Sequence, residues 1–173
     1  LTVTGANGRL ALVGENPVRS LRTGPKLTVD GEGSLTLTAD GAETAINATG
    51  ELQIENGTLT ADAGVNIDTL RMKGGAVDLT NIAATYNIRN FELADGTFTA
   101  KDTLRTDKLV VKGGTLDIDV TTESGDDPSG ITPYSDAEGQ RYYFLGGNVT
   151  LSRTGNSGSG GLFSWGTGGG VAV

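Results

Sequence analysis

Two series of short alternating segments keep step along most of the chain, and this repeat constrains the fold more than any other feature. In the first series a glycine opens each apolar-polar-apolar run, and successive glycines lie 24, 18, 21, 18 and 33 residues apart. In the second series an apolar-x-apolar run lies slightly upstream, and its spacings of 25, 18, 21, 18 and 34 residues follow the first. The first series opens at Gly33, Gly57, Gly75, Gly96, Gly114 and Gly147, and the second at Leu27, Leu52, Leu70, Phe91, Leu109 and Tyr143.

Alternation with a period of two places apolar side chains on one side of each run and Thr, Asp, Glu or Arg on the other. Turn pairs such as Asn56-Gly57 and Gly74-Gly75 separate the runs and allow a sharp bend. A unit of about 20 residues with three short strands stacks on its own copy, as in solenoids. We therefore predict an all-β fold, a single-stranded right-handed parallel β-helix with about 18–25 residues per coil, right-handed being the default for parallel crossovers. The alternative is an antiparallel sandwich or barrel, because Asn-Gly and Asp-Gly also favour hairpins.

Stacking of the repeat predicts which residues fill the core and how the chain is divided. One inner row is expected to comprise Leu35, Leu59, Val77, Phe98, Leu116 and Val149, and the adjacent outward row Thr36, Thr60, Asp78, Thr99, Asp117 and Thr150. We predict a single domain over residues 1–173, with repeat coils from about 9 to 152 and a Gly-rich capping tail from 153 to 173. Both ends are strand-like, so we interpret the chain as a domain excised from a longer surface protein.

The amino-acid composition excludes several kinds of functional site and argues against two kinds of partner. The 173 residues include no Cys and no His, which excludes disulfides, thiolate metal sites and nucleophilic triads built on His. The net charge of −8 argues against a nucleic-acid partner, since phosphate binding requires a basic surface. No stretch approaches the ~20 apolar residues of a membrane span, so no membrane insertion by this segment is expected.

The sixth unit of the repeat begins 33 residues after the fifth, a longer spacing than between the other units. The additional residues form an acidic, proline-containing loop over 121–140. Carboxylates gathered on a loop supply the oxygen ligands that calcium prefers. The candidate metal ligands are Asp126, Asp127, Asp136 and Glu138, with calcium as the candidate cofactor. No Asp-x-Asp-x-Asp-Gly register occurs, so a solvated polar loop is the alternative interpretation.

Aromatic residues near the C-terminal end suggest a surface for sugar rings. Trp165, the only tryptophan, lies in a Gly-rich segment, and Tyr134 and Tyr142 precede it. We take these three as candidate ligand-binding residues, while a cap over the open end of the core is the structural alternative for Trp165. Cations also gather in the central coils, where they are expected either to meet an acidic polysaccharide or to neutralise the surface: Arg71, Lys73, Arg89, Lys101, Arg105, Lys108 and Lys112. Stacking of the repeat is expected to place Glu55 beside Lys73 and Arg71 beside Glu92 as cross-strand ion pairs.

The segment Leu12-Val13-Gly14-Glu15-Asn16, followed by Leu27-Thr28-Val29-Asp30-Gly31-Glu32-Gly33-Ser34-Leu35-Thr36-Leu37-Thr38, resembles bacterial cell-surface parallel β-helix repeat proteins. The resemblance covers roughly residues 9 to 152 and includes the coil from Leu109 to Val120. It implies kinship with β-helical carbohydrate-binding proteins, including pectin-binding ones that hold calcium. The regular acidic Asp-Gly-Ile register of such proteins is missing, so no individual ligand residue is carried over.

These observations lead to three functional hypotheses. The first is a secreted or cell-surface module that binds a polysaccharide or a host or cell-surface glycan without catalysis, beside neighbouring domains of the same chain. The second is a structural stalk or adhesin segment with no ligand of its own. The third is a polysaccharide lyase or hydrolase, for which Asp78 and Asp117 form the best carboxylate pair.

Overall fold

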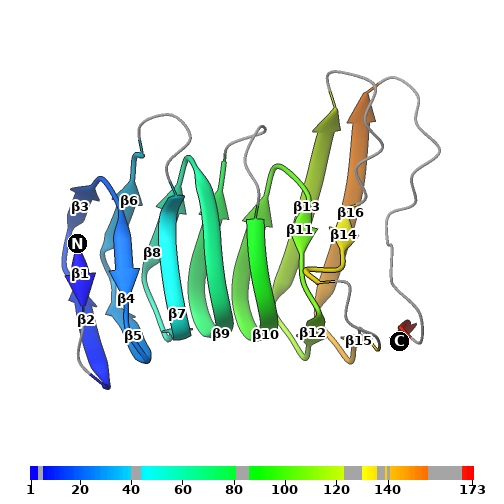
Figure 1. Ribbon diagram of the computed structural model, residues 1–173, viewed down its shortest axis with the longest axis horizontal. Coiled ribbons are helices and arrows are strands. Elements are labelled where there is room, and N and C mark those ends of the chain that lie inside the picture. Colours follow the sequence, from blue (N-terminus) through cyan, green and yellow to red (C-terminus); the bar gives the residue numbers. More distant parts are fainter. Residues whose placement is uncertain are drawn as a thin grey trace.

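The strands of this protein stack into a β-solenoid (Figure 1). The computed structural model describes residues 1–3, 6–39, 44–80, 86–122, 130–135, 139, 141–155 and 169–173. Every strand pairing in these ranges is parallel, with partners one coil apart. The same ranges contain no helix, and hence none able to cross a bilayer. The predicted parallel solenoid is confirmed, and the antiparallel sandwich is excluded.

Three strand faces, here called A, B and C, run along the solenoid. Face A contains β1 (Thr2–Val3), β4 (Leu21–Thr23), the first part of β7 (Thr44–Ile54), β9 (Gly64–Leu79) and β10 (Tyr86–Ala100), β11 (Leu104–Arg105) and β14 (Ile131–Thr132). Face B contains β2 (Gly8–Leu12), β5 (Lys26–Gly31), the last part of β7, the middle parts of β9 and β10, β12 (Lys108–Val111), β15 (Arg141–Phe144) and β17 (Gly170–Ala172). Face C contains β3 (Glu15–Val18), β6 (Ser34–Leu37), β8 (Thr58–Ala61), the ends of β9 and β10, β13 (Thr115–Thr122) and β16 (Asn148–Gly155).

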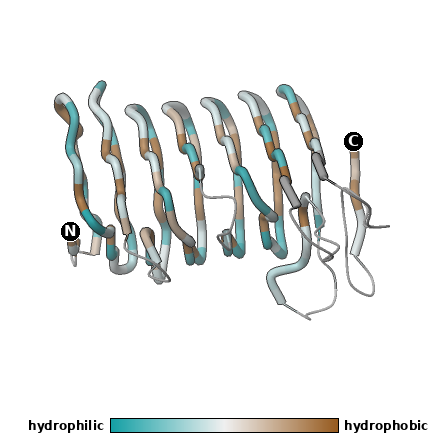
Figure 2. Tube along the Cα trace, turned by 90° about the horizontal axis from the view of Figure 1, so that it is seen from above, coloured by the Kyte–Doolittle hydropathy of each residue, from teal (hydrophilic) through white to brown (hydrophobic). Residues whose placement is uncertain are grey.

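Successive coils lie side by side as ribs, with apolar segments recurring from rib to rib (Figure 2). The predicted inner row is confirmed: Leu35, Leu59, Val77, Phe98, Leu116 and Val149 are register partners in order. All but Val149, which is 37% exposed, are buried. Faces B and C meet in the core, where the rings of Phe91 and Phe98 lie 4.7 Å apart between centroids. Each such buried side chain contributes about 1.5–3 kcal/mol to the hydrophobic stabilisation.

Coils extend slightly beyond the predicted repeat at both ends. Before residue 9, Thr2 and Val3 pair with Arg22 and Thr23 as the face A strand of the first coil. After residue 152, the strand Gly170–Ala172 pairs with β15 on face B. The described end of the Gly-rich tail therefore continues the solenoid. Residues 156–168, including Trp165, lie outside the described residues.

The register of the sixth unit corrects one sequence prediction. Leu109 pairs with Tyr142, whereas the spacing of the second series had aligned it with Tyr143. Tyr142 is consequently fully buried, and its hydroxyl donates a hydrogen bond to the Thr106 carbonyl at 3.3 Å. Because a shift of one residue exchanges the two faces of a strand, Tyr143 is the outward residue instead.

A column of positive-φ glycines forms the corner between faces B and C, at Gly57, Gly75, Gly96, Gly114 and Gly147. The backbone of each coil approaches the next so closely here that a Cβ on Gly96 would lie 2.5 Å from the Gly75 carbonyl oxygen. Backbone bonds such as Ala76 N to Gly57 O, at 2.8 Å, connect the coils at the same corner. Glycine at this corner is therefore required both by its φ and by the distance between coils.

Gly96→Ala and Gly14→Ala separate these two requirements. Gly14 also has positive φ, at 68°, but a Cβ there would have no neighbour within 4 Å, so Gly14→Ala is expected to lower the free energy of unfolding by about 1 kcal/mol. Gly96→Ala adds a backbone clash and should cost about 3 kcal/mol. Urea denaturation of both variants measures the difference. Equal losses in the two variants would contradict close stacking at the glycine corner.

Candidate functional site

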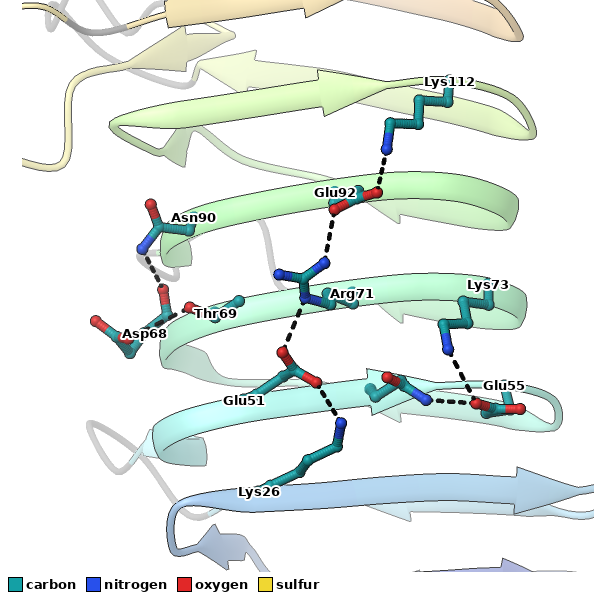
Figure 3. Close-up of polar contacts among 11 residues, drawn as sticks. Lys26, Glu51, Glu55, Asp68, Thr69, Arg71, Lys73, Asn90, Glu92 and Lys112 are labelled. Atoms are coloured by element: carbon teal, nitrogen blue, oxygen red, sulfur yellow. Dashed lines mark hydrogen bonds and ion pairs between the residues drawn. The ribbon is translucent and has the colours of Figure 1, made fainter. Parts of the chain in front are cut away.

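The outer surface of face B carries a chain of alternating charges that crosses the coils (Figure 3). Register stacking brings equivalent positions of successive coils together, so like charges in one row would repel. Opposite charges occupy neighbouring coils instead, and each carboxylate bridges two cations. The links are Lys26 Nζ–Glu51 Oε1 at 2.7 Å, Glu51 Oε2–Arg71 Nε at 2.8 Å, Arg71 Nη1–Glu92 Oε2 at 2.9 Å and Glu92 Oε1–Lys112 Nζ at 2.6 Å. We call this set the charge ladder.

The charge ladder keeps its carboxylates ionised. The hydrogen bond from Lys26 lowers the pKa of Glu51, against an opposing effect of burial, with Arg71 adding to the decrease. The hydrogen bond from Lys112 lowers the pKa of Glu92 in the same way, with smaller contributions from Arg71 and Lys108. Both carboxylates are thus held as anions that neutralise cations of the ladder.

A shallow groove of about 280 Å³ lies on face B at the C-terminal part of the charge ladder. Strands β9, β10 and β12 form it. Its lining residues are Thr69, Arg71, Asn90, Phe91, Glu92, Lys108, Val110 and Lys112. Three of these are cations and one is a carboxylate, so the groove is locally basic although the whole chain carries a charge of −8.

Lys108 is a cation of face B that lies outside the charge ladder. Its row reads Lys26, Glu51, Thr69, Asn90, Lys108 and Arg141. Lys108 is exposed and forms no ion pair within the described part of the chain. In its row it lies between the neutral Asn90 and the like-charged Arg141. Glu92, whose pKa it lowers, is already paired with Arg71 and Lys112, so this arrangement favours an added anion.

Neutral groups beside Lys108 complete the groove. The Asn90 amide donates to the Asp68 carbonyl oxygen at 3.2 Å, which fixes the side chain at the corner between faces A and B. In the adjacent row, Val110 and Tyr143 are register partners and both are partly exposed. The groove therefore combines an ammonium group, an amide and the apolar Val110, on which Tyr143 stacks one coil further along.

The aromatic residues predicted to bind sugar do not form one exposed surface among the described residues. Tyr134 is 37% exposed, on the segment after β14, where Asp107 accepts hydrogen bonds from Ser135 N at 3.0 Å and Ser135 Oγ at 2.8 Å. Tyr142 is a core residue, and burial raises the pKa of its phenol. Its ring has no face available to a sugar, so this prediction is corrected. The remaining predicted residues lie outside the described residues: Trp165, Asp126, Asp127, Asp136 and Glu138.

The cations predicted to gather in the central coils are largely neutralised, as one of the two interpretations expected. Arg71, Lys73 and Lys112 each form an ion pair on face B. The predicted neighbours Glu55–Lys73 and Arg71–Glu92 are confirmed, at 3.4 and 2.9 Å. The exceptions among the described residues are Lys108 on face B and Arg105 on face A, which form no ion pair. Lys108 could have been found only by aligning the coils residue by residue. No metal-binding group of three or more acidic side chains occurs among the described residues.

Comparisons with known proteins identify no relative: no family model, no curated protein and no solved structure matches the chain. By its fold, the protein belongs to the class of parallel β-solenoids. The likeness to pectin-binding repeat proteins stays a prediction.

Glu92→Gln tests whether the charge ladder contributes to stability. A carboxyl whose folded pKa lies below the unfolded value near 4.5 stabilises the fold fully above that value, and the contribution is lost as pH falls through the folded pKa. At pH 7 the variant should lose about 0.5–1 kcal/mol of unfolding free energy, as expected for a partly exposed pair.

Urea denaturation at pH 7 and pH 3 measures this effect, and the difference between wild type and variant should be smaller at pH 3 than at pH 7. Glu32→Gln is the control, because Glu32 is exposed and forms no ion pair in the described ranges. A difference that persists unchanged at pH 3 would show that the loss has another origin than the ionised carboxylate.

Proposed function

We propose that this protein is a secreted or cell-surface β-solenoid module that binds polysaccharide without catalysis, and that the basic groove on face B contacts an anionic chain. The observation that carries the proposal is Lys108, an exposed cation with no ion pair in the described ranges, beside an amide and an apolar strip. An open groove on a regular face suits a polymer that passes over several coils better than a small molecule that must be enclosed.

Each part of the groove has a matching group on an acidic sugar. The Lys108 ammonium pairs with a carboxylate or sulfate, and the charge assists the hydrogen bond. Thr69 and the Asn90 amide oxygen suit sugar hydroxyls, since both can accept a hydrogen bond. Val110 and Tyr143 offer apolar surface to the C–H face of a ring. The ligand class is therefore a polysaccharide of uronic acid or sulfated sugar residues.

The chemistry of the groove supports binding rather than turnover. Glycoside hydrolysis needs two carboxyl groups in different protonation states near the scissile bond. Glu92 is the one carboxylate lining the groove, and Lys112 and Arg71 lower its pKa, so it is a poor proton donor. Asp78 and Asp117, the pair considered for catalysis, lie on face C, two coils apart with Thr99 between them.

A structural stalk is the second candidate, and the charge ladder favours it. Neutralised cations on successive coils are what a solvated, rigid rod requires, with no ligand. Both candidates share the solenoid and differ only in what the groove does. Lys108 distinguishes them, since a stalk does not depend on its charge.

Lys108→Gln is expected to weaken retention by polygalacturonate about tenfold in affinity gel electrophoresis at low salt, through loss of one charge-assisted hydrogen bond. Binding by the wild type should also decrease as salt rises, because the groove is exposed to solvent. Each gel is run with calcium and with chelator, so that a contribution of the acidic loop appears separately.

Lys26→Gln is the matched control. Lys26 belongs to the same row as Lys108, but it pairs with Glu51 and does not line the groove. Retention of this variant should equal that of the wild type. Equal losses in both variants would indicate a nonspecific charge effect, and an absence of retention by every anionic polymer would favour the stalk.

A further inference from the structure

We propose a second polysaccharide site on the outer surface of face A, formed by an asparagine row that binds a neutral, hydroxyl-rich chain lying along the solenoid axis. The row consists of Asn47, Asn66 and Asn87, with Arg22 and Arg105 at its ends. It is independent of the basic groove, because it lies on another face and offers amides instead of ammonium groups.

The register places these side chains in a single line. Arg22 pairs with Asn47, Asn47 with Asn66, Asn66 with Asn87 and Asn87 with Arg105. Parallel neighbours repeat about every 4.8 Å, so the row presents one amide or guanidinium group per coil. Each row residue lies between two buried residues of its own strand, as Asn66 does between Val65 and Ile67. The row is therefore a line of outward side chains with the core directly beneath it.

The folded structure gives no internal reason for three asparagines here. Asn is depleted in strands, where Thr or Val would be favoured. Stacked asparagines can compensate by bonding to one another along the axis. Within the described ranges, however, the amides of Asn47, Asn66 and Asn87 form no hydrogen bond with one another or with any other residue. Three successive coils therefore carry a residue that strands disfavour, and no hydrogen bond offsets this cost. Such a violation of local preference indicates a functional surface.

The chemistry of the row specifies its ligand. Each amide offers donors and an acceptor together, and a sugar hydroxyl likewise donates and accepts. The row contains no carboxylate, although the chain as a whole has a net charge of −8. Arg22 and Arg105 add donors for hydroxyl or ring oxygens at each end. One amide per coil also approximates the advance of one sugar in an extended chain, so successive sugars can meet successive amides.

The test uses Asn66→Thr combined with Asn87→Thr, which removes two amides while placing a better strand former at each position. Affinity gel electrophoresis against hydroxyethyl cellulose, galactomannan and arabinoxylan measures retention by neutral polymers. We expect the wild type to be retained by at least one polymer, largely independently of salt. The double variant should bind it about tenfold more weakly, because two hydrogen-bonding groups are lost.

Two controls accompany the double variant. Asn148→Thr is the same substitution at an exposed outward position of face C and should leave retention unchanged. Lys108→Gln should also leave neutral-polymer binding unchanged, while the double variant should keep the wild-type affinity for polygalacturonate. The experiment can therefore contradict one proposed site without contradicting the other.

Several results would overturn the asparagine row as a site. They are the absence of retention by every neutral polymer, unchanged binding by the double variant, and an equal effect of Asn148→Thr. A parallel loss of anionic binding in the double variant would indicate one shared surface and would contradict the independence of the row.

Discussion

The close parallel stacking of one coil on the next is the constraint on which the rest of the structure depends. At the corner between faces B and C the backbones approach so closely that a side-chain carbon on Gly96 would lie 2.5 Å from the Gly75 carbonyl oxygen. Stacking at this distance fixes the register of the flanking strands. Register in turn decides which side chains form continuous rows in the core and which form rows on the surface.

Three outward surfaces follow from the same register, and each has its own chemistry. Face A presents amides between two arginines, face B presents the charge ladder with Lys108 beside it, and face C presents a row of Thr and Asp residues. Alternation on face B removes the repulsion that in-register stacking would otherwise create. The two proposed binding surfaces are centred on Lys108, which forms no ion pair among the described residues, and on Asn47, Asn66 and Asn87, whose amides form no hydrogen bond there.

Much of the fold could be predicted from the sequence, because the period of two and the recurring glycines report directly on stacking. The core row from Leu35 to Val149 and the pair Glu55–Lys73 were both predicted from residue spacing alone. Tyr142 was misplaced because the long insertion before it removes the reference for the register, and an error of one residue exchanges core and surface. The groove could not be predicted, since it depends on which of several cations forms no ion pair in three dimensions. The right-handed turn of the coils stays a prediction.

The register after the insertion is the most direct test of the account, and the absence of native cysteines makes it accessible. Val110 and Tyr143 are outward register partners, so the Val110→Cys, Tyr143→Cys double variant should form an intramolecular disulfide on mild oxidation. The Val110→Cys, Tyr142→Cys double variant should not, because Tyr142 points into the core. Mass spectrometry without reduction distinguishes the two. Cross-linking of the second pair in preference to the first would contradict the register of the sixth unit, and with it the stacking of Arg141 on Lys108 and of Tyr143 on Val110.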